Sequence, residues 1–230
     1  MFTNAASFAG LHRGIIVSCQ AGEESPLNAP HFIAALAQSA ELGGAVGFRV
    51  DRPENVAAVR AVSKKPIIGI NKLPSDEWDV YITPTFEAAR AVVTAGADIV
   101  ALDATSRPRP EALERLIERI HAELGVPVMA DIGSVEEGLH AQSMGADLVA
   151  STLVSTPPYG RPEDGPGFGV IAELVQALDV PVIVEGQVWT IEDVRRCYDL
   201  GVHSVVIGSA ITVPQFITAR FARAVPMGAA

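Results

Sequence analysis

The sequence predicts an α/β fold, a single (β/α)8 barrel with eight parallel strands that occupies residues 1–230 as one domain. Short runs rich in Val and Ile alternate along the chain with amphipathic segments of helical length. Strands separated by helices pair in parallel through right-handed crossovers, and near-continuous apolar runs indicate strands that are covered on both faces. Eight such units in a chain of this length suit a closed TIM barrel better than an open sheet.

The eight apolar runs define the predicted strands. They lie near residues 14–20, 45–50, 65–72, 97–105, 126–133, 146–153, 180–188 and 202–211. Helical periodicity is clearest in residues 110–125, 134–145 and 190–201, where Ser134 and Thr190 are suitable N-caps and a glycine ends each segment. An open sheet of six to eight strands is the alternative, but it would normally carry a GxGxxG phosphate loop after an early strand, and the sequence has none.

Composition excludes several classes of protein. Hydrophobic residues make up 49% of the chain and charged residues 19%, which is enough for a large core. A net charge of −10 argues against binding to nucleic acid or to an anionic membrane surface, because both select basic faces. The two cysteines, Cys19 and Cys197, form no disulfide framework, and this indicates a reducing compartment.

The remaining global signals predict a soluble cytoplasmic protein without a metal. The first twenty residues lack the basic start and apolar run of a signal peptide. No apolar stretch approaches the ~20 residues that a membrane helix needs. The five histidines show no ligand spacing, so we expect no protein-bound metal.

Each predicted strand ends at or near a polar residue or a Gly-Ser pair. These positions are Gln20, Arg49, Lys72, Asp103, Asp131, Thr152, Glu185 and Gly208-Ser209. Any strand that leaves a core must become polar where it meets water, which would explain one such residue. Barrel enzymes, however, place their chemistry at the carboxyl ends of the strands. A lysine and a glutamate among eight such ends therefore favour a catalytic site.

The ends of the last two strands predict a phosphate site. In barrel enzymes the loops after strands seven and eight, with the N-terminus of a short helix, recurrently bind phosphate. Gly186 and Gly208 would let the backbone approach the ligand closely, and Ser209 adds a hydroxyl. Backbone N–H donors can hold a phosphate even in an acidic protein.

Two loops are placed to reach over the predicted mouth. Residues 106–110 supply Arg107 and Arg109 after strand four, and residues 156–169 contain four prolines and four glycines after strand six. The longer loop has the length of a lid, although a plain surface loop explains it equally well. His203 begins strand eight, at the opposite end of the barrel, so we expect a structural role for it.

A set of motifs then resembles a known family. IIVSCQA, GGAVGFR, PIIGINK, IVALDATSRPRP, VMADI, VEGQV and GVHSVVIGSAIT occur in this order between residue 14 and about residue 222. They resemble the bacterial N-acetylmannosamine-6-phosphate 2-epimerases. The resemblance implies a cofactor-free barrel that interconverts N-acetylmannosamine 6-phosphate and N-acetylglucosamine 6-phosphate in sialic acid catabolism.

The resemblance also implies roles for individual residues. Lys72 maps to the family's acid/base and Glu185 to the residue that works beside it, with phosphate near Gly186 and Gly208. Gln20, Arg49 and Asp131 map to substrate contacts, and Asp103, Arg107 and Thr152 complete the predicted substrate-binding set through their places at strand ends. Val213 stands where the family pattern GGAITRP has an arginine that would help to hold the ligand.

Epimerisation at C2 needs a base near the C2 proton and stabilisation of the enolate. Lys72 can act as a base only if burial or a neighbouring cation such as Arg49 lowers its pKa from the usual ~10.4. An ionised Glu185 would raise the pKa of Lys72, so the two must titrate as a coupled pair. We expect Lys72 to move the C2 proton while Glu185 handles a sugar hydroxyl or the second face.

Two other functions fit the same sequence. One is another phosphosugar isomerase or lyase on the same barrel, such as an aldolase in which Lys72 forms a Schiff base. The other is a non-catalytic barrel that binds a sugar phosphate and regulates a partner. For any of the three we expect a small phosphosugar ligand and a homodimer.

Overall fold

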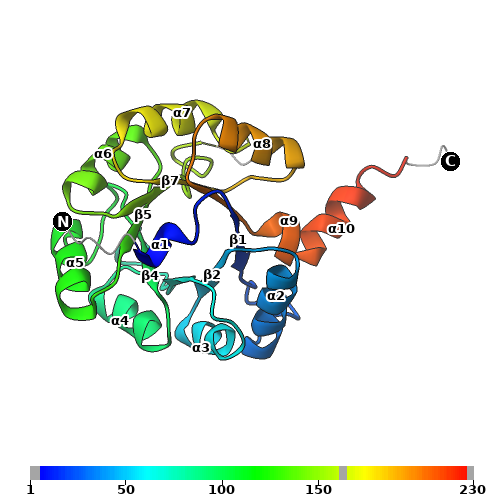
Figure 1. Cartoon of the computed structure of the whole chain (residues 1–230), viewed down its shortest axis with the longest axis horizontal. Helices are drawn as coiled ribbons and strands as arrows, with labels where there is room; N and C mark the ends of the chain where they lie inside the picture. Colours follow the sequence, from blue (N-terminus) through cyan, green and yellow to red (C-terminus); the bar gives the residue numbers. More distant parts are fainter. Residues whose placement is uncertain (1–5, 161–164, 227–230) are drawn as a thin grey trace.

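The computed structural model describes residues 6–160 and 165–226 and shows a closed barrel of eight parallel strands in sequential order (Figure 1). The strands are β1 Ile15–Cys19, β2 Gly47–Asp51, β3 Ile67–Ile70, β4 Ile99–Asp103, β5 Val128–Asp131, β6 Leu148–Ala150, β7 Val182–Glu185 and β8 Ser204–Ile207. The pairing of β8 with β1 closes the sheet, with Ile16 opposite Val206. The predicted (β/α)8 barrel is confirmed, and each strand lies within or one residue beyond its predicted run.

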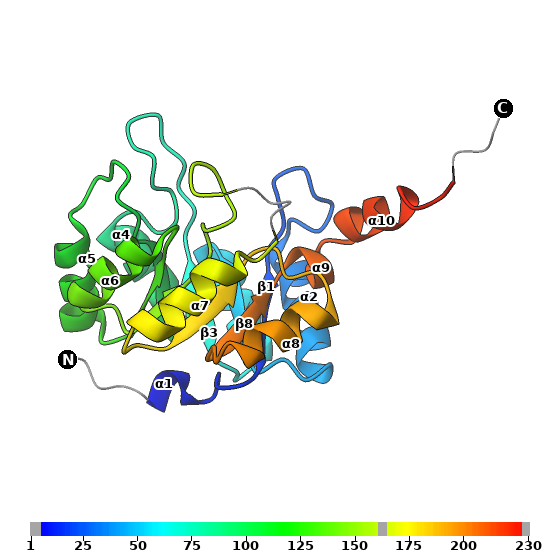
Figure 2. The same ribbon diagram turned by 90° about the horizontal axis from the view of Figure 1, so that it is seen from above.

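Most of the helices cover the outside of the barrel and follow the strands in turn. They are α1 Ala6–Ala9, α2 Pro30–Leu42, α3 Pro53–Val62, α4 Phe86–Thr94, α5 Leu113–Arg119, α6 Val135–Ser143, α7 Phe168–Ala177, α8 Ile191–Asp199, α9 Ser209–Thr212 and α10 Pro214–Ala222. Figure 2 shows α1 beneath one end of the barrel and long loops rising from the opposite end. The last helix, α10, extends away from the barrel in both views.

Side-chain caps fix where several helices begin. Thr85, Ser134 and Thr190 each accept a hydrogen bond from the backbone N–H three residues later, which satisfies a donor that the helix leaves free. Thr190 and Asp193 form a complete capping box. The two caps predicted from sequence, Ser134 and Thr190, are thus present.

The helix predicted for residues 110–125 differs in detail. The α-helical part begins later, at Leu113, and its last turn widens into a π-helix, η1 Ile120–Leu124. Ile120 stays fully buried in this wide turn, and Gly125 ends it with a left-handed φ of 69°. The apolar stripe is therefore kept although the hydrogen-bond register changes.

The barrel interior follows from the alternation of side chains along each strand. The apolar residues that fill it are Ile16, Ile68, Ile70, Ile99, Ala101, Met129, Leu148, Ala150, Ile183 and Val206, with Leu11 and Ile82. Leu11 packs so tightly against Gly47 that a Cβ there would lie 2.6 Å from the leucine Cδ2. Continuing the same alternation toward the carboxyl ends places Glu185 above Ile183 and Asp131 above Met129, so polar side chains lie over an apolar base.

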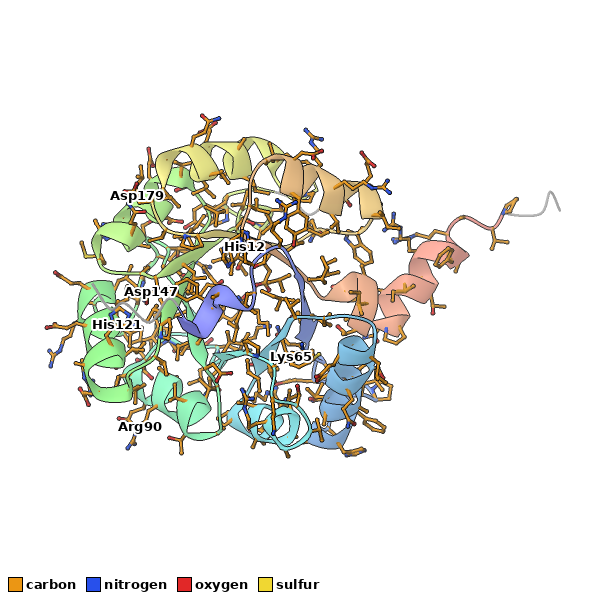
Figure 3. All side chains as sticks on the ribbon, in the orientation of Figure 1. His12, Lys65, Arg90, His121, Asp147 and Asp179 are labelled. Carbon is orange, nitrogen blue, oxygen red and sulfur yellow. The ribbon has the colours of Figure 1, made fainter. Side chains whose placement is uncertain are left out.

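His12, His203 and the two cysteines lie in the packing of the fold. His12 lies over the barrel end near α1 (Figure 3), with its Nδ1 3.3 Å from Nδ1 of His203, which precedes β8. Cys19 and Cys197 are both free and buried. Among the described residues no helix is long and apolar enough to cross a membrane.

Candidate active site

A cavity of about 570 Å³ opens at the carboxyl ends of the strands. This volume lies in the ordinary range for small-molecule sites, about 300–1,000 Å³. Its lining comes from β1, β2, β3, β6, β7, β8 and the segments that follow them, including α9 and the start of α10. The predicted residues among them are Gln20, Lys72, Thr152, Glu185, Gly186, Gly208 and Ser209.

Lys72 lies two residues beyond β3 and is held in extended geometry. A single antiparallel bridge joins it to Ile82, and its backbone N–H donates to Oδ1 of Asp51 at 2.9 Å. The side chain therefore continues the inward alternation of Ile68 and Ile70. Its Nζ donates to Oε1 of Gln20 at 2.6 Å, which fixes the amine in the cavity wall.

The surroundings of Lys72 lower the pKa of its ammonium group. Burial is the largest cause, because it penalises the charged form, and the nearby guanidinium of Arg49 acts in the same direction. The carboxylates of Asp51 and Glu185 oppose the change. The net direction, downward from 10.5, is the one that a lysine base requires.

Glu185 ends β7 and faces the cavity with a side chain that is 14% exposed. Its Oε2 accepts an ion pair from Arg49 Nη1 at 2.7 Å, and Thr152 Oγ1 lies 3.5 Å from the same oxygen. Burial nevertheless raises the pKa of Glu185 to about 7, since the loss of hydration outweighs the charge of Arg49. A carboxyl group with this pKa can give or take a proton near neutral pH.

The raised pKa of Glu185 predicts a pH-dependent stability. Between pH 4.5 and about pH 7 the folded protein keeps a proton on Glu185 that the unfolded chain releases. The free energy of unfolding therefore falls as pH rises through this window. Glu185→Gln removes the ionisation, and we expect it to raise the free energy of unfolding at pH 8 by about 2 kcal/mol. Urea unfolding at pH 8 and pH 4.5 checks this, and an equal effect at both values would contradict it.

Arg49 and Asp131 form a buried layer beneath the cavity. Arg49 is 1% exposed and Asp131 is 0% exposed, and two hydrogen bonds of 2.9 and 2.7 Å join them in a bidentate pair. Thr152 Oγ1 also donates to Asp131 Oδ1 at 2.6 Å. Neither charged residue lines the cavity, so the structure shows them positioning Glu185 and Thr152, and their contact with substrate stays a prediction.

Asp103 and Arg107 belong to a neighbouring cluster after β4. Arg107 Nη2 pairs with Oδ2 of the fully buried Asp103, while Oδ1 accepts from Thr105 Oγ1 at 2.6 Å. Arg109 Nη2 donates to the backbone oxygen of Asp103 at 2.9 Å. Neither Asp103 nor Arg107 lines the main cavity, so the structure does not bring them into contact with the Lys72 site.

The end of the cavity near β7 and β8 is built from small residues. Gly186 has a φ of 100°, a conformation that favours glycine. At Gly208 a Cβ would lie 3.2 Å from Cβ of Ser18, so the two strands approach closely there. Thr212 Oγ1 donates to the backbone oxygen of Ser18 at 2.8 Å and ties α9 to β1.

The loop of residues 156–169, which the sequence offers as a candidate lid, is described only in part. Residues 161–164 of this loop lie outside the described residues. Tyr159 packs against Gly133 and donates from its hydroxyl to Glu137 Oε1 at 2.6 Å. None of the described loop residues lines the main cavity, although Gly165 and Pro166 line a second hollow next to Trp189.

The sequence prediction missed several residues of the site. These are Ser18, Asp51, Arg52, Gln187, Trp189 and Phe216, all of which line the cavity. Ser18 and Asp51 could have been found, because they lie two residues after the inward-facing Ile16 and Arg49. Gln187 and Trp189 lie in an irregular loop, and Phe216 lies on α10, which no strand pattern indicates.

The described residues hold no group of three or more His, Cys, Asp or Glu side chains that could bind a metal. The fold and the cavity are those of a barrel enzyme, with an amine and a carboxyl group of shifted pKa in one cavity at the carboxyl ends of the strands.

The family follows from comparison with known proteins. The family described as "Putative N-acetylmannosamine-6-phosphate epimerase" matches residues 33–227, and the chain belongs to this family. Relatives named "Putative N-acetylmannosamine-6-phosphate 2-epimerase" include one from Clostridioides difficile, 45% identical over 213 residues, which cover 92% of this chain and 95% of the relative. One from Thermosynechococcus vestitus is 46% identical over 211 residues, 90% of this chain and 92% of the relative.

Solved structures agree with this placement. The N-acetylmannosamine-6-phosphate 2-epimerase from Clostridium perfringens superposes with a TM-score of 0.90 at 38% identity and covers 94% of both chains. A thiamine phosphate pyrophosphorylase from Pyrococcus furiosus gives a TM-score of 0.59 at 19% identity over 88% of both chains. This second likeness concerns the fold alone.

Proposed function

We propose that the protein is an isomerase that interconverts N-acetylmannosamine 6-phosphate and N-acetylglucosamine 6-phosphate, as its family indicates. The observation that carries the chemistry is the pair of Lys72 and Glu185 in one cavity, with the pKa of the amine lowered and that of the carboxyl raised. These opposite shifts bring both groups toward neutral pH, where each can exchange a proton.

The proposed reaction moves one proton at C2 of the open-chain sugar. Neutral Lys72 takes the C2 proton, and the electron pair of the C–H bond moves into an enolate whose charge rests on the carbonyl oxygen. Return of a proton to the other face of C2 gives the epimer, so no atom is gained or lost. Glu185 handles a proton on a sugar oxygen, and Arg49 and Asp131 hold its carboxyl group in place.

The remaining cavity residues fit the rest of the substrate. Gln20, which accepts from Lys72, and Thr152 are placed to bind sugar hydroxyls. Gly186, Gly208 and Ser209 are proposed to hold the phosphate through backbone N–H groups and one hydroxyl. The family relationship supports epimerisation over an aldolase reaction at Lys72 or a regulatory role without turnover.

The test is an NMR time course of the purified protein with N-acetylmannosamine 6-phosphate in D₂O. We expect the gluco epimer to accumulate with deuterium at C2, because a proton exchanged through Lys72 equilibrates with solvent. If the sugar were neither converted nor deuterated at C2, the proposal would be contradicted. Loss of activity on borohydride treatment with substrate, and a covalent adduct on Lys72, would instead indicate the aldolase chemistry.

We further propose a cytoplasmic homodimer. The metabolic family and the free cysteines support the compartment. Helix α10 has no buried residue and leaves Phe221 73% exposed, which supports a second copy as the partner of this helix. Light scattering in solution would give the mass of the assembly.

A further inference from the structure

Arg52 lines the active-site cavity, and its backbone conformation is unusual for an arginine. It follows β2 directly, with φ 75° and ψ 142°, in a region that residues with a Cβ rarely adopt. Its backbone N–H donates to Ile70 O at 2.9 Å and its oxygen accepts from Val56 N at 3.0 Å, so both neighbouring elements hold this conformation. A glycine would adopt it with less strain.

The side chain of Arg52 is only loosely engaged. Its closest carboxylate is Glu23, whose Oε1 lies 3.7 Å from Nη2, and Glu23 is 85% exposed. Arg52 itself is 35% exposed. An ion pair so open to water contributes little to stability, so it does not account for an arginine at this strained position.

The charges of the cavity give Arg52 a distinct place. Among the described lining residues the cations are Lys72 and Arg52, and the acids are Glu23, Asp51 and Glu185. Lys72 is the proposed base and must spend part of its time uncharged. Val213, at the β8 end, brings no charge to the lining. Among these lining residues Arg52 is therefore the one side chain with a permanent positive charge that a dianionic phosphate can contact, because a guanidinium stays protonated.

We propose that Arg52 is a specificity-determining residue that binds the phosphate group of the substrate and leaves Glu23 when it does so. The inference rests on the proposed function for the identity of the ligand. Arginine suits this task because its planar fork can donate two parallel hydrogen bonds to phosphate oxygens. The backbone donors at Gly186 and Gly208 then need only complete the site.

Two substitutions separate the charge from the backbone. Arg52→Ala and Arg52→Gly both remove the guanidinium, and we expect each to raise KM for N-acetylmannosamine 6-phosphate about tenfold, with kcat changed far less. The dissociation constant of inorganic phosphate, measured by calorimetry, should rise by a similar factor. Arg52→Gly should unfold at a higher temperature than Arg52→Ala, because only glycine is unstrained at this φ.

Glu23→Gln is the matched control, since it removes the other half of the ion pair. Its KM should stay constant or fall, because the arginine is freed and a negative charge leaves the cavity. Equal increases in KM for Glu23→Gln and Arg52→Ala would overturn the inference, as would unchanged phosphate binding in both Arg52 variants. If the parent protein does not convert the sugar, but both Arg52 variants bind inorganic phosphate more weakly than the parent, the proposed function fails and the anion site stands.

Discussion

Lys72→Ala should lower kcat for epimerisation by about a thousandfold while the protein stays folded. The side chain is the only amine placed at the base of the described cavity, and its pKa is already shifted downward by burial. Removing a half-buried ammonium also removes its cost of desolvation, so the unfolding temperature should be at least that of the parent protein. Initial rates by NMR and a thermal unfolding curve check both statements.

The pH dependence of the rate provides a second check on Lys72. Because only the neutral amine is a base, kcat/KM should rise with pH and level off below the ordinary lysine value of 10.5. Lys64→Ala is a suitable control, since Lys64 is exposed before β3, and it should keep the parent rate. Substantial activity in Lys72→Ala would remove Lys72 from the mechanism.

Arg49→Met should destabilise the fold by about 3 kcal/mol at neutral pH, because it leaves two buried carboxylates without their counter-charge. Asp131 is 0% exposed and Glu185 is 14% exposed, and both pair with Arg49 at 2.7 Å. Without the guanidinium the pKa of Glu185 would rise further, because burial would act without the opposing charge of Arg49. The loss should therefore be largest at high pH and smaller near pH 5, which urea unfolding at the two values would show.

Two variants define what the Arg49 result means. Arg90→Met removes an exposed arginine that pairs with Glu87 on the outside of α4 (Figure 3), and it should change stability by less than about 0.5 kcal/mol. Arg49→Met combined with Asp131→Leu should recover much of the loss, because an apolar pair replaces an unmatched charge. If the single and double variants were equally unstable, lost packing rather than charge would be the cause.

The fold could be predicted from sequence because it depends on local patterns. Each strand is an apolar run buried on both faces, and glycines and capping residues such as Thr190 separate the runs from the helices. The widened turn at Ile120–Leu124 could not be predicted, since it keeps the same buried stripe as an α-helix and leaves no mark in the hydrophobic pattern.

The site was predictable to the extent that it lies at strand ends. Lys72, Glu185, Gln20 and Thr152 share one cavity because parallel strands bring their carboxyl ends to one face. How deep each side chain lies below the cavity could not be predicted. The layer to which a side chain such as Arg49 belongs depends on how neighbouring strands are staggered.

The closure of the barrel has a consequence for how the protein is made. Strand β8 pairs with β1, and Ser209, Thr212 and Val213 from the end of the chain line the cavity. A ribosome that adds about 5–20 residues per second takes about 7 to 28 seconds to pass from Lys72 to these positions. Lys72 is therefore synthesised early but has no complete pocket around it until β8 and α9 emerge. A nascent chain that ends before β8 lacks part of the cavity wall. It can therefore neither bind the sugar phosphate in a complete site nor use ligand binding to assist its folding.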